Sequence, residues 1–267
     1  MNLEKRLSIL NAVAFIIAFF VSTASQFKIM SNADIGEVSH KYDTLFAPIG
    51  LTFSIWGVIY ISLFAFCIYH LIKAFTESKE HEANRDLRTI DYLFIINNIA
   101  ATFWVLAWLN EYIFISVILM IIQCVSLIKI SIRLKLYNSH KTILSKVLTQ
   151  VPLSIYLGWI TVASIANTNA FLWHSSWISW KLPESYWTVL LLTAIALISL
   201  YVIFIKKNVV FGLVVIWAVY GIVLKAELVD AGLSVDVILA GWIVIALLVV
   251  SEVIQIFKNF KNRTIVS

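Results

Sequence analysis

The sequence predicts an all-α fold, a polytopic bundle of eight transmembrane helices with both termini in the cytoplasm. Of the 267 residues, 61% are hydrophobic and only 13% are charged, whereas soluble domains carry roughly 25% charged residues. The charged residues fall almost entirely outside eight apolar windows, each close to the ~20 residues that a bilayer core requires. The Lys and Arg residues are also distributed very unevenly between alternate loops.

The eight windows follow one another with short polar breaks. They cover 7–27, 49–72, 92–110, 112–128, 147–173, 185–205, 209–224 and 237–257. Each window should be a helix, because lipid cannot satisfy the backbone groups of an open strand edge. Only Glu111 separates the third and fourth windows. One helix over both is an alternative, but at about 37 residues it would be roughly twice the length of a span, so a tight turn fits better.

The loop charges set the orientation of the spans. With the N-terminus inside, all but four of the 20 Lys and Arg residues fall in cytoplasmic segments, the exceptions being Lys28, Lys41, Lys181 and Lys225. This is the bias that multispanning proteins show. It also explains the net charge of +5, so no nucleic-acid partner is expected. The charged 73–88 segment is expected to be a solvated cytoplasmic loop.

Aromatic stripes mark three of the windows. The residues of interest are Phe53, Trp56 and Tyr60 in the second window, Asn97 and Trp104 in the third, and Tyr156, Trp159, Ala163 and Asn167 in the fifth. Within each window these positions share one face of a helix by the 3.6-residue period. Buried rings with a few polar groups suit a flat, mostly apolar ligand. Plain helix packing is the alternative explanation for the same stripes.

Other tryptophans lie at the outer ends of their windows and are expected to form an interfacial belt. They are Trp108, Trp173, Trp177, Trp180 and Trp187. The five histidines, including His70 and His140, lack the spacing of a metal pair, so no metal site is expected. No catalytic motif is recognisable either.

These residues resemble the TspO/MBR family, the tryptophan-rich sensory proteins and translocator proteins. The fifth window carries the best match, because Tyr156, Trp159, Ala163 and Asn167 are similar to the family's Y-L-x-W-x-x-x-A-T-x-L-N. In the second window Leu51 stands in the place of the family's first Trp. In the third, the family pattern Q-x-x-x-N-x-x-W is matched by Asn97 and Trp104 but has Ala101 in the place of the middle amide.

The resemblance implies a five-helix membrane core over 1–173, followed by three additional transmembrane helices and a short cytoplasmic tail over 174–267. It further implies a ligand pocket lined by Phe53, Trp56, Tyr60, Trp104, Tyr156 and Trp159. Ala163 would keep the pocket floor open, and Asn97 and Asn167 would bond the ligand's edge. The 28–48 loop would cover the outer mouth of the pocket as a lid.

The function implied is that of a ligand-binding or sensory protein of the cell membrane that takes a porphyrin, haem or another flat hydrophobic compound. No cofactor is required, and the expected partners are that ligand, membrane lipids and, in one arrangement, a second copy of the chain. The alternative function is transport of a small solute with the help of the last three helices, although a transporter should show an internal repeat. An enzyme is not expected, and breakdown of a bound porphyrin, which needs no dedicated acid or base, stays open.

Overall fold

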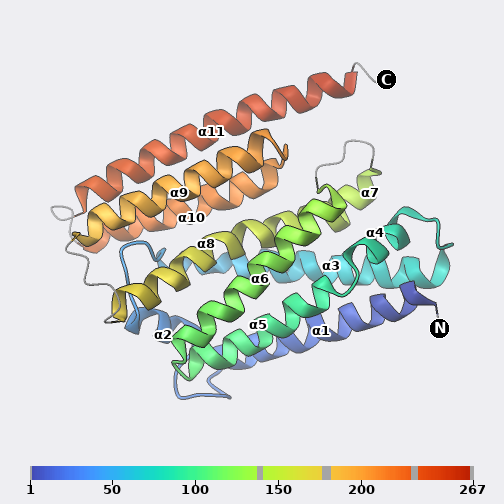
Figure 1. Ribbon diagram of the computed structural model, residues 1–267, viewed down its shortest axis with the longest axis horizontal. Helices are drawn as coiled ribbons and strands as arrows, with labels where there is room; N and C mark the ends of the chain where they lie inside the picture. Colours follow the sequence, from blue (N-terminus) through green and yellow to red (C-terminus); the bar gives the residue numbers. More distant parts are fainter. Residues whose placement is uncertain (1, 137–140, 176–181, 230–233, 265–267) are drawn as a thin grey trace. The chain divides into compact units, whose positions relative to one another are not determined.

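The computed structural model describes residues 2–136, 141–175, 182–229 and 234–264 (Figure 1). Within these ranges the chain is helical and contains no strand, which confirms the all-α prediction. Among the described residues, seven helices are long and apolar enough to cross a membrane, and an eighth span is present if the bent pair α4 and α5 counts as one. His140, Trp177, Trp180 and Lys181, named above, lie outside the described residues.

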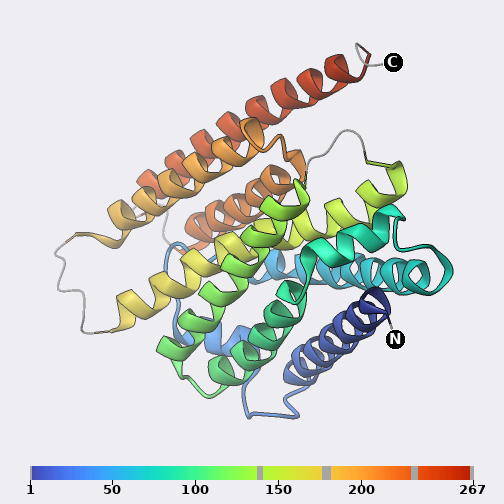
Figure 2. The same cartoon turned by 45° about the vertical axis from the view of Figure 1, so that its right-hand side comes forward.

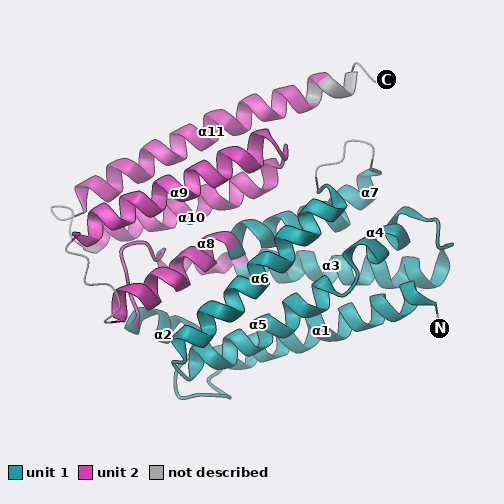
Figure 3. Ribbon diagram, in the orientation of Figure 1, with its two compact units in different colours: residues 1–41, 56–160 teal, residues 42–55, 161–267 magenta. Residues whose placement is uncertain are grey.

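The chain divides into two compact units, coloured separately in Figure 3. Unit 1 comprises residues 1–41 and 56–160, and unit 2 comprises residues 42–55 and 161–267. One boundary therefore falls inside helix α8 (Val151–His174). The units do not follow the segments 1–173 and 174–267 that were defined by counting spans, and that grouping of the spans stays a prediction.

Unit 1 holds most of the first five predicted spans. Its helices are α1 (Leu3–Gln26), α2 (Ile35–Lys41), α3 (Ile55–Thr76), α4 (Glu82–Ile90), α5 (Leu93–Leu109), α6 (Ile113–Leu134), α7 (Ile143–Ser145), the π-helix η2 (Lys146–Gln150) and the first part of α8. Helix α5 packs against α1, α2 and α6, and α4 packs against α1 and α6. The apolar faces of these helices thus close around α5.

A tight turn separates α5 from α6, as predicted. Glu111 has a positive φ of 59°, and its N–H donates to the Trp108 carbonyl over 3.0 Å. The next N–H, of Tyr112, donates to the Ala107 carbonyl over 2.8 Å. These two bonds are those of a Schellman motif, which satisfies the last carbonyls of a helix and reverses the chain. Two short spans therefore replace one long helix.

The 73–88 segment was predicted to be a solvated loop, and this prediction is wrong for its second half. Its second half belongs to α4, which buries Ala83, Leu87 and Ile90 on one face. The spacing of these residues is that of an amphipathic helix. The His81 side chain accepts a hydrogen bond of 3.2 Å from the Ala83 N–H at the start of α4. The apolar stripe was too short to stand out in a segment this rich in charge.

Unit 2 contains α9 (Glu184–Phe204), α10 (Val209–Val229) and α11 (Val235–Thr264), together with the second part of α8 and the short 3₁₀ helix η1 (Gly50–Ser54). Helices α9, α10 and α11 pack along one another, and they run side by side in both views (Figures 1 and 2). Small residues permit the close approach. A Cβ at Gly241 of α11 would overlap the Val223 side chain of α10.

Candidate functional site

Four of the predicted pocket residues meet in unit 1. The Trp56 ring of α3 stacks on Tyr60, one turn later, with centroids 5.3 Å apart and an interplanar angle of 24°. From α8, Tyr156 and Trp159 approach Trp56 at 6.2 and 6.3 Å with steeply inclined planes. Offset and edge-to-face arrangements of this kind are the favourable ones for aromatic rings. We call Trp56, Tyr60, Tyr156 and Trp159 the aromatic cluster.

The members of the aromatic cluster differ in exposure. Tyr156 and Trp159 are both buried, with 3% of their surface exposed, whereas Trp56 and Tyr60 are half-buried. The Tyr60 hydroxyl donates to Ser22 of α1 over 2.6 Å, and Phe19 of α1 places its ring edge-on to Tyr60 at 5.2 Å. The two rings from α3 are therefore partly accessible, whereas the two rings from α8 are not.

A polar network adjoins the aromatic cluster. The Asn97 amide nitrogen donates to the Gln123 carbonyl and to the Ser126 hydroxyl, each over 3.0 Å. The Tyr156 hydroxyl donates to the Gln123 side-chain oxygen over a longer 3.5 Å. Asn97 is therefore linked to the cluster through Gln123, which the aromatic stripes had not identified. Gln123 is the one side-chain amide in the 112–128 window, and this could have drawn attention to it.

Trp104 and Trp108 form a further ring pair, on α5. Their rings stack at 5.8 Å with an interplanar angle of 15°. Trp108 was expected in the interfacial belt, and this prediction is wrong, because it is 5% exposed and its indole N–H donates to the Ile35 carbonyl of α2 over 3.2 Å. A buried indole N–H needs an acceptor, and α2 supplies one. The 28–48 loop thus contains a helix that packs on the C-terminal end of α5.

The remaining predicted pocket residues, Phe53, Ala163 and Asn167, belong to unit 2. Ala163 and Asn167 lie on α8, as expected, and Asn167 is buried. Phe53 was expected to continue the helical face of Trp56 and Tyr60, and this expectation is wrong, because Phe53 lies in η1, before α3 begins. In η1 the Thr52 carbonyl accepts a hydrogen bond of 3.0 Å from the Trp217 indole of α10.

Comparison with family models gives one match, to the model described as TSPO-like protein, over residues 8–254. The chain belongs to the TSPO-like protein family. Together with the apolar helices, this makes it a multi-pass membrane protein. The match to the TSPO-like model is not confined to 1–173 and takes in α9, α10 and most of α11. Comparisons with curated proteins and with solved structures give no match.

The 42–55 segment of this TSPO-like chain is attached to the C-terminal helices of unit 2 by polar contacts. Lys225 of α10 forms an ion pair with Asp43 and donates to the Thr44 carbonyl over 2.8 Å. Glu184, at the start of α9, accepts a hydrogen bond of 2.7 Å from the Leu45 N–H. Each of these helices therefore contributes a directional bond to one short segment.

Asn169 of α8 joins the same attachment. Its amide nitrogen donates to the Thr44 hydroxyl over 2.9 Å, and its oxygen accepts a bond of 2.7 Å from the Trp187 indole of α9. Asn169 is 2% exposed, so both of its polar ends are satisfied inside the protein. The family resemblance drew attention to Asn167, two positions earlier, and did not include Asn169, which bonds Thr44 of the 42–55 segment.

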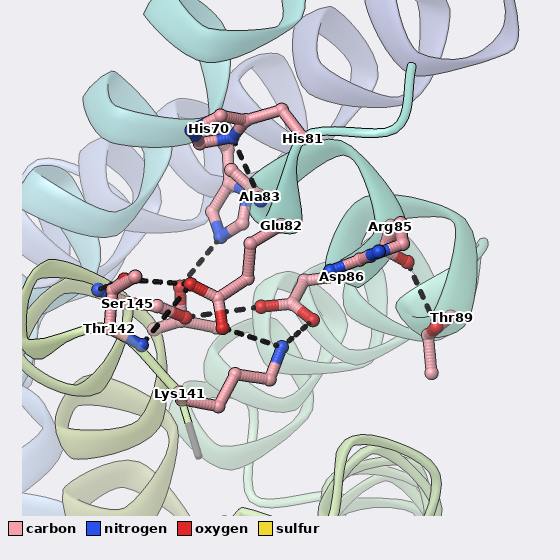
Figure 4. Close-up of polar contacts among 11 residues, drawn as sticks. His70, His81, Glu82, Ala83, Arg85, Asp86, Thr89, Lys141, Thr142 and Ser145 are labelled. Carbon is pink, nitrogen blue, oxygen red and sulfur yellow. Dashed lines mark hydrogen bonds and ion pairs between the residues drawn. The ribbon is translucent and has the colours of Figure 1, made fainter. Parts of the chain in front are cut away.

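A second polar cluster of the TSPO-like chain lies in unit 1 and joins α4 to the α7 region (Figure 4). Lys141 pairs with Asp86 and, at 3.6 Å, with Glu82. The Thr142 hydroxyl donates to Glu82 over 2.7 Å. The fully buried His70 of α3 exchanges a 3.0 Å hydrogen bond with Thr149 of the π-helix. The side chains are bonded to one another, which is the arrangement of a structural cross-link.

Proposed function

We propose that this TSPO-like chain is a ligand-binding, sensory protein whose aromatic cluster takes up a flat hydrophobic ligand of the porphyrin type. The observation that carries the proposal is the pairing of two half-buried, stacked rings, Trp56 and Tyr60, with two buried rings, Tyr156 and Trp159. A planar ligand can stack on the first pair while the second pair holds Trp56 in place. Stacking of this kind favours flat aromatic ligands.

The polar neighbours of the cluster support a ligand with polar edges. Ser22 and Gln123 are the partners of the Tyr60 and Tyr156 hydroxyls, and the buried oxygen of Asn97 accepts no hydrogen bond from the described residues. Burying an amide oxygen without a donor costs free energy. Within this proposal, small shifts of these side chains offer both donors and acceptors to a ligand such as a porphyrin or haem.

The proposed activity is binding in the cell membrane, with no required cofactor and no enzymatic step, alone or as a homodimer. Breakdown of a bound porphyrin is an outcome of the same experiment, because it would appear as a steady loss of porphyrin absorbance after binding. A stable absorbance spectrum is expected.

In the experiment, the purified full chain is titrated with protoporphyrin. Binding is monitored through the absorbance of the bound porphyrin, so that the loss of a Trp does not alter the signal. Trp56→Ala and Trp159→Ala should each weaken binding by roughly 1 to 3 kcal/mol, the usual range for a buried ring at a binding hot spot. Trp242→Ala is the matched control, because Trp242 is an α11 ring that pairs with Tyr220 in unit 2. Equal affinity in all three variants would refute the aromatic site.

Transport of a small solute is the second candidate, and Glu252 of α11 favours it. This side chain is 3% exposed, and neither of its carboxylate oxygens has a hydrogen-bond partner among the described residues. The side chain packs so closely on α10 that a Cβ added to Gly212 would overlap a carboxylate oxygen of Glu252. Ionisable side chains inside a span are expensive and commonly mark the path of an ion or proton.

Proton-coupled transport can be measured in liposomes that contain the purified chain and a trapped pH-sensitive dye. An imposed pH gradient should decay faster than in empty liposomes, and Glu252→Gln should abolish the difference, whereas Trp56→Ala should leave it unchanged. Decay at the rate of empty liposomes would count against transport of this kind.

A further inference from the structure

A cavity of about 420 Å³ lies in unit 2, where α9 ends and α11 approaches its own end. It is lined by Phe204, Lys207, Gln255, Lys258 and Lys261. This volume is within the range of small-molecule sites in proteins. Three of the five lining residues are lysines and none is acidic. We call these five residues the lysine pocket.

The local fold places the lysines around the pocket. Three residues after α9 ends at Phe204, Lys207 adopts a left-handed conformation with a φ of 55°. The following N–H, of Asn208, donates to the Val202 carbonyl over 3.2 Å. This hydrogen bond holds the turn that carries Lys207 against the last part of α9. From α11, the Lys258 ammonium lies 5.4 Å from the centroid of the Phe204 ring, a cation–π distance.

The inner wall of the pocket is polar. Gln255 is 3% exposed, and its amide nitrogen donates to the Asn259 side chain over 2.8 Å. An acidic residue precedes it by one turn, but Glu252 packs against the position of Gly212 and is not part of the lining. The pocket therefore combines a buried amide and an aromatic ring with several ammonium groups.

Two lysines of the pocket, Lys207 and Lys258, form no ion pair with the described residues. Lys207 and Lys258 have no carboxylate within 4.0 Å in the part of the chain that the structure describes. Elsewhere lysines of this chain do have such partners, as in Lys73–Glu77 and Lys225–Asp43. Like charges gathered around one cavity repel one another, and an anion placed between them removes the repulsion.

We propose that the lysine pocket binds a phosphate group, carried either by the headgroup of an anionic phospholipid or by a free phosphate compound. Lysine ammonium groups bind phosphate as point charges, and basic pockets between transmembrane helices on the cytoplasmic side accept anionic headgroups. The predicted orientation puts the ends of both α9 and α11 on that side. Phe204 offers an apolar surface to the glycerol and acyl part of a lipid.

The experiment measures binding of short-chain phosphatidylglycerol to the purified full chain in a neutral detergent. The matched short-chain phosphatidylcholine is the zwitterionic probe, and inorganic phosphate is the competitor. Lys207→Gln/Lys258→Gln removes two charges from the pocket. Lys129→Gln/Lys135→Gln is the control, because it removes the same charge from two exposed lysines at the end of α6.

Saturable binding of phosphatidylglycerol is expected. Each lysine near an anionic headgroup contributes about 1 kcal/mol, so the affinity should be roughly thirtyfold lower in the pocket variant, which loses two lysines, and unchanged in the control variant. Lys207→Arg/Lys258→Arg should restore binding. Displacement by inorganic phosphate would identify the phosphate group alone as the ligand, and no displacement would identify the lipid. Equal weakening in the pocket and control variants, or equal binding of phosphatidylcholine, would overturn the proposal.

Discussion

The aromatic cluster of unit 1 and the attachment of the 42–55 segment in unit 2 hold distant parts of the chain together by different forces. In the cluster, rings from α3 and α8 pack on one another. In the attachment, α8, α9 and α10 each bond the segment through a polar side chain. Aromatic rings present flat apolar faces, on which a flat ligand can stack in the same offset way as another ring. Hydrogen bonds in an apolar setting are costly to leave unmade. The proposed ligand site lies in the first region, and the bonded contacts of the second region are those of a structural attachment.

The largest expected effect tests the close packing of the attachment. A Cβ on Gly221 would overlap the Thr52 side chain, whereas a Cβ on Gly57 of α3 meets nothing within 4 Å. Gly221→Ala should therefore lower the free energy of unfolding by about 2 to 3 kcal/mol, and Gly57→Ala should be neutral or slightly stabilising, because alanine favours a helix. Thermal unfolding of both variants in detergent checks this. A harmless Gly221→Ala would show that the 42–55 segment can move away at little cost.

The next prediction concerns the hydrogen bonds of the attachment. Asn169→Leu keeps the size of the side chain but leaves the Trp187 indole and the Thr44 hydroxyl without their partner. We expect a loss of about 2 kcal/mol in stability, within the range for unsatisfied buried groups. Porphyrin affinity should stay within about twofold of the wild type, since the aromatic cluster is intact. A large loss of affinity with unchanged stability would reverse the roles of the two regions.

A smaller effect is expected when a hydrogen bond is removed from the aromatic cluster. Tyr60→Phe deletes the hydroxyl that donates to Ser22 but keeps the ring that stacks on Trp56. The stability should fall by about 1 kcal/mol or less, the net contribution of one ordinary hydrogen bond. The fall should be clearly smaller than that of Asn169→Leu when the two are unfolded side by side. Equal losses would mean that both regions depend on polar bonds to the same extent.

The smallest effect is expected in the exposed 28–48 loop. Lys28 lies 2.5 Å from Glu37 of α2, and its hydrogen bond holds the pKa of that carboxyl below the ordinary value of 4.5, with a further contribution from the Asp34 backbone. A lowered pKa means that the stabilisation is complete above about pH 4.5 and is lost as the pH falls below it.

Hydrogen exchange of the α2 amides, corrected for the intrinsic effect of pH, should accelerate when the pH is lowered through this range. Glu37→Gln removes the titrating group, and its α2 amides should show the same corrected exchange at both pH values. Helix α2 accepts the Trp108 indole hydrogen bond in unit 1. Acceleration limited to α2 would show that the attachment in unit 2 is unaffected. Acceleration that spreads to the 42–55 segment would show that the two regions open together.

The site was only partly predictable from the sequence. Trp56 and Tyr60 share a helical face and do stack, because their spacing alone brings them together on α3. Phe53 does not continue that face, because Trp217, more than 160 residues away in the chain, bonds the Thr52 carbonyl within η1. Periodicity carries no information about a partner so distant. The same limit applies to Asn169, whose partners lie in the 42–55 segment and on α9.

The sequence by itself determined that this is an all-helical membrane protein with seven or eight spans, because apolar length is a local property that a bilayer converts directly into helices. It also determined the family, through short motifs that later agreed with a match over residues 8–254. Only the tertiary structure decided that α4 is buried, that Trp108 lies under α2, and that the C-terminal helices bond the 42–55 segment. These outcomes depend on which distant donor meets which acceptor, and that choice is made when the helices pack.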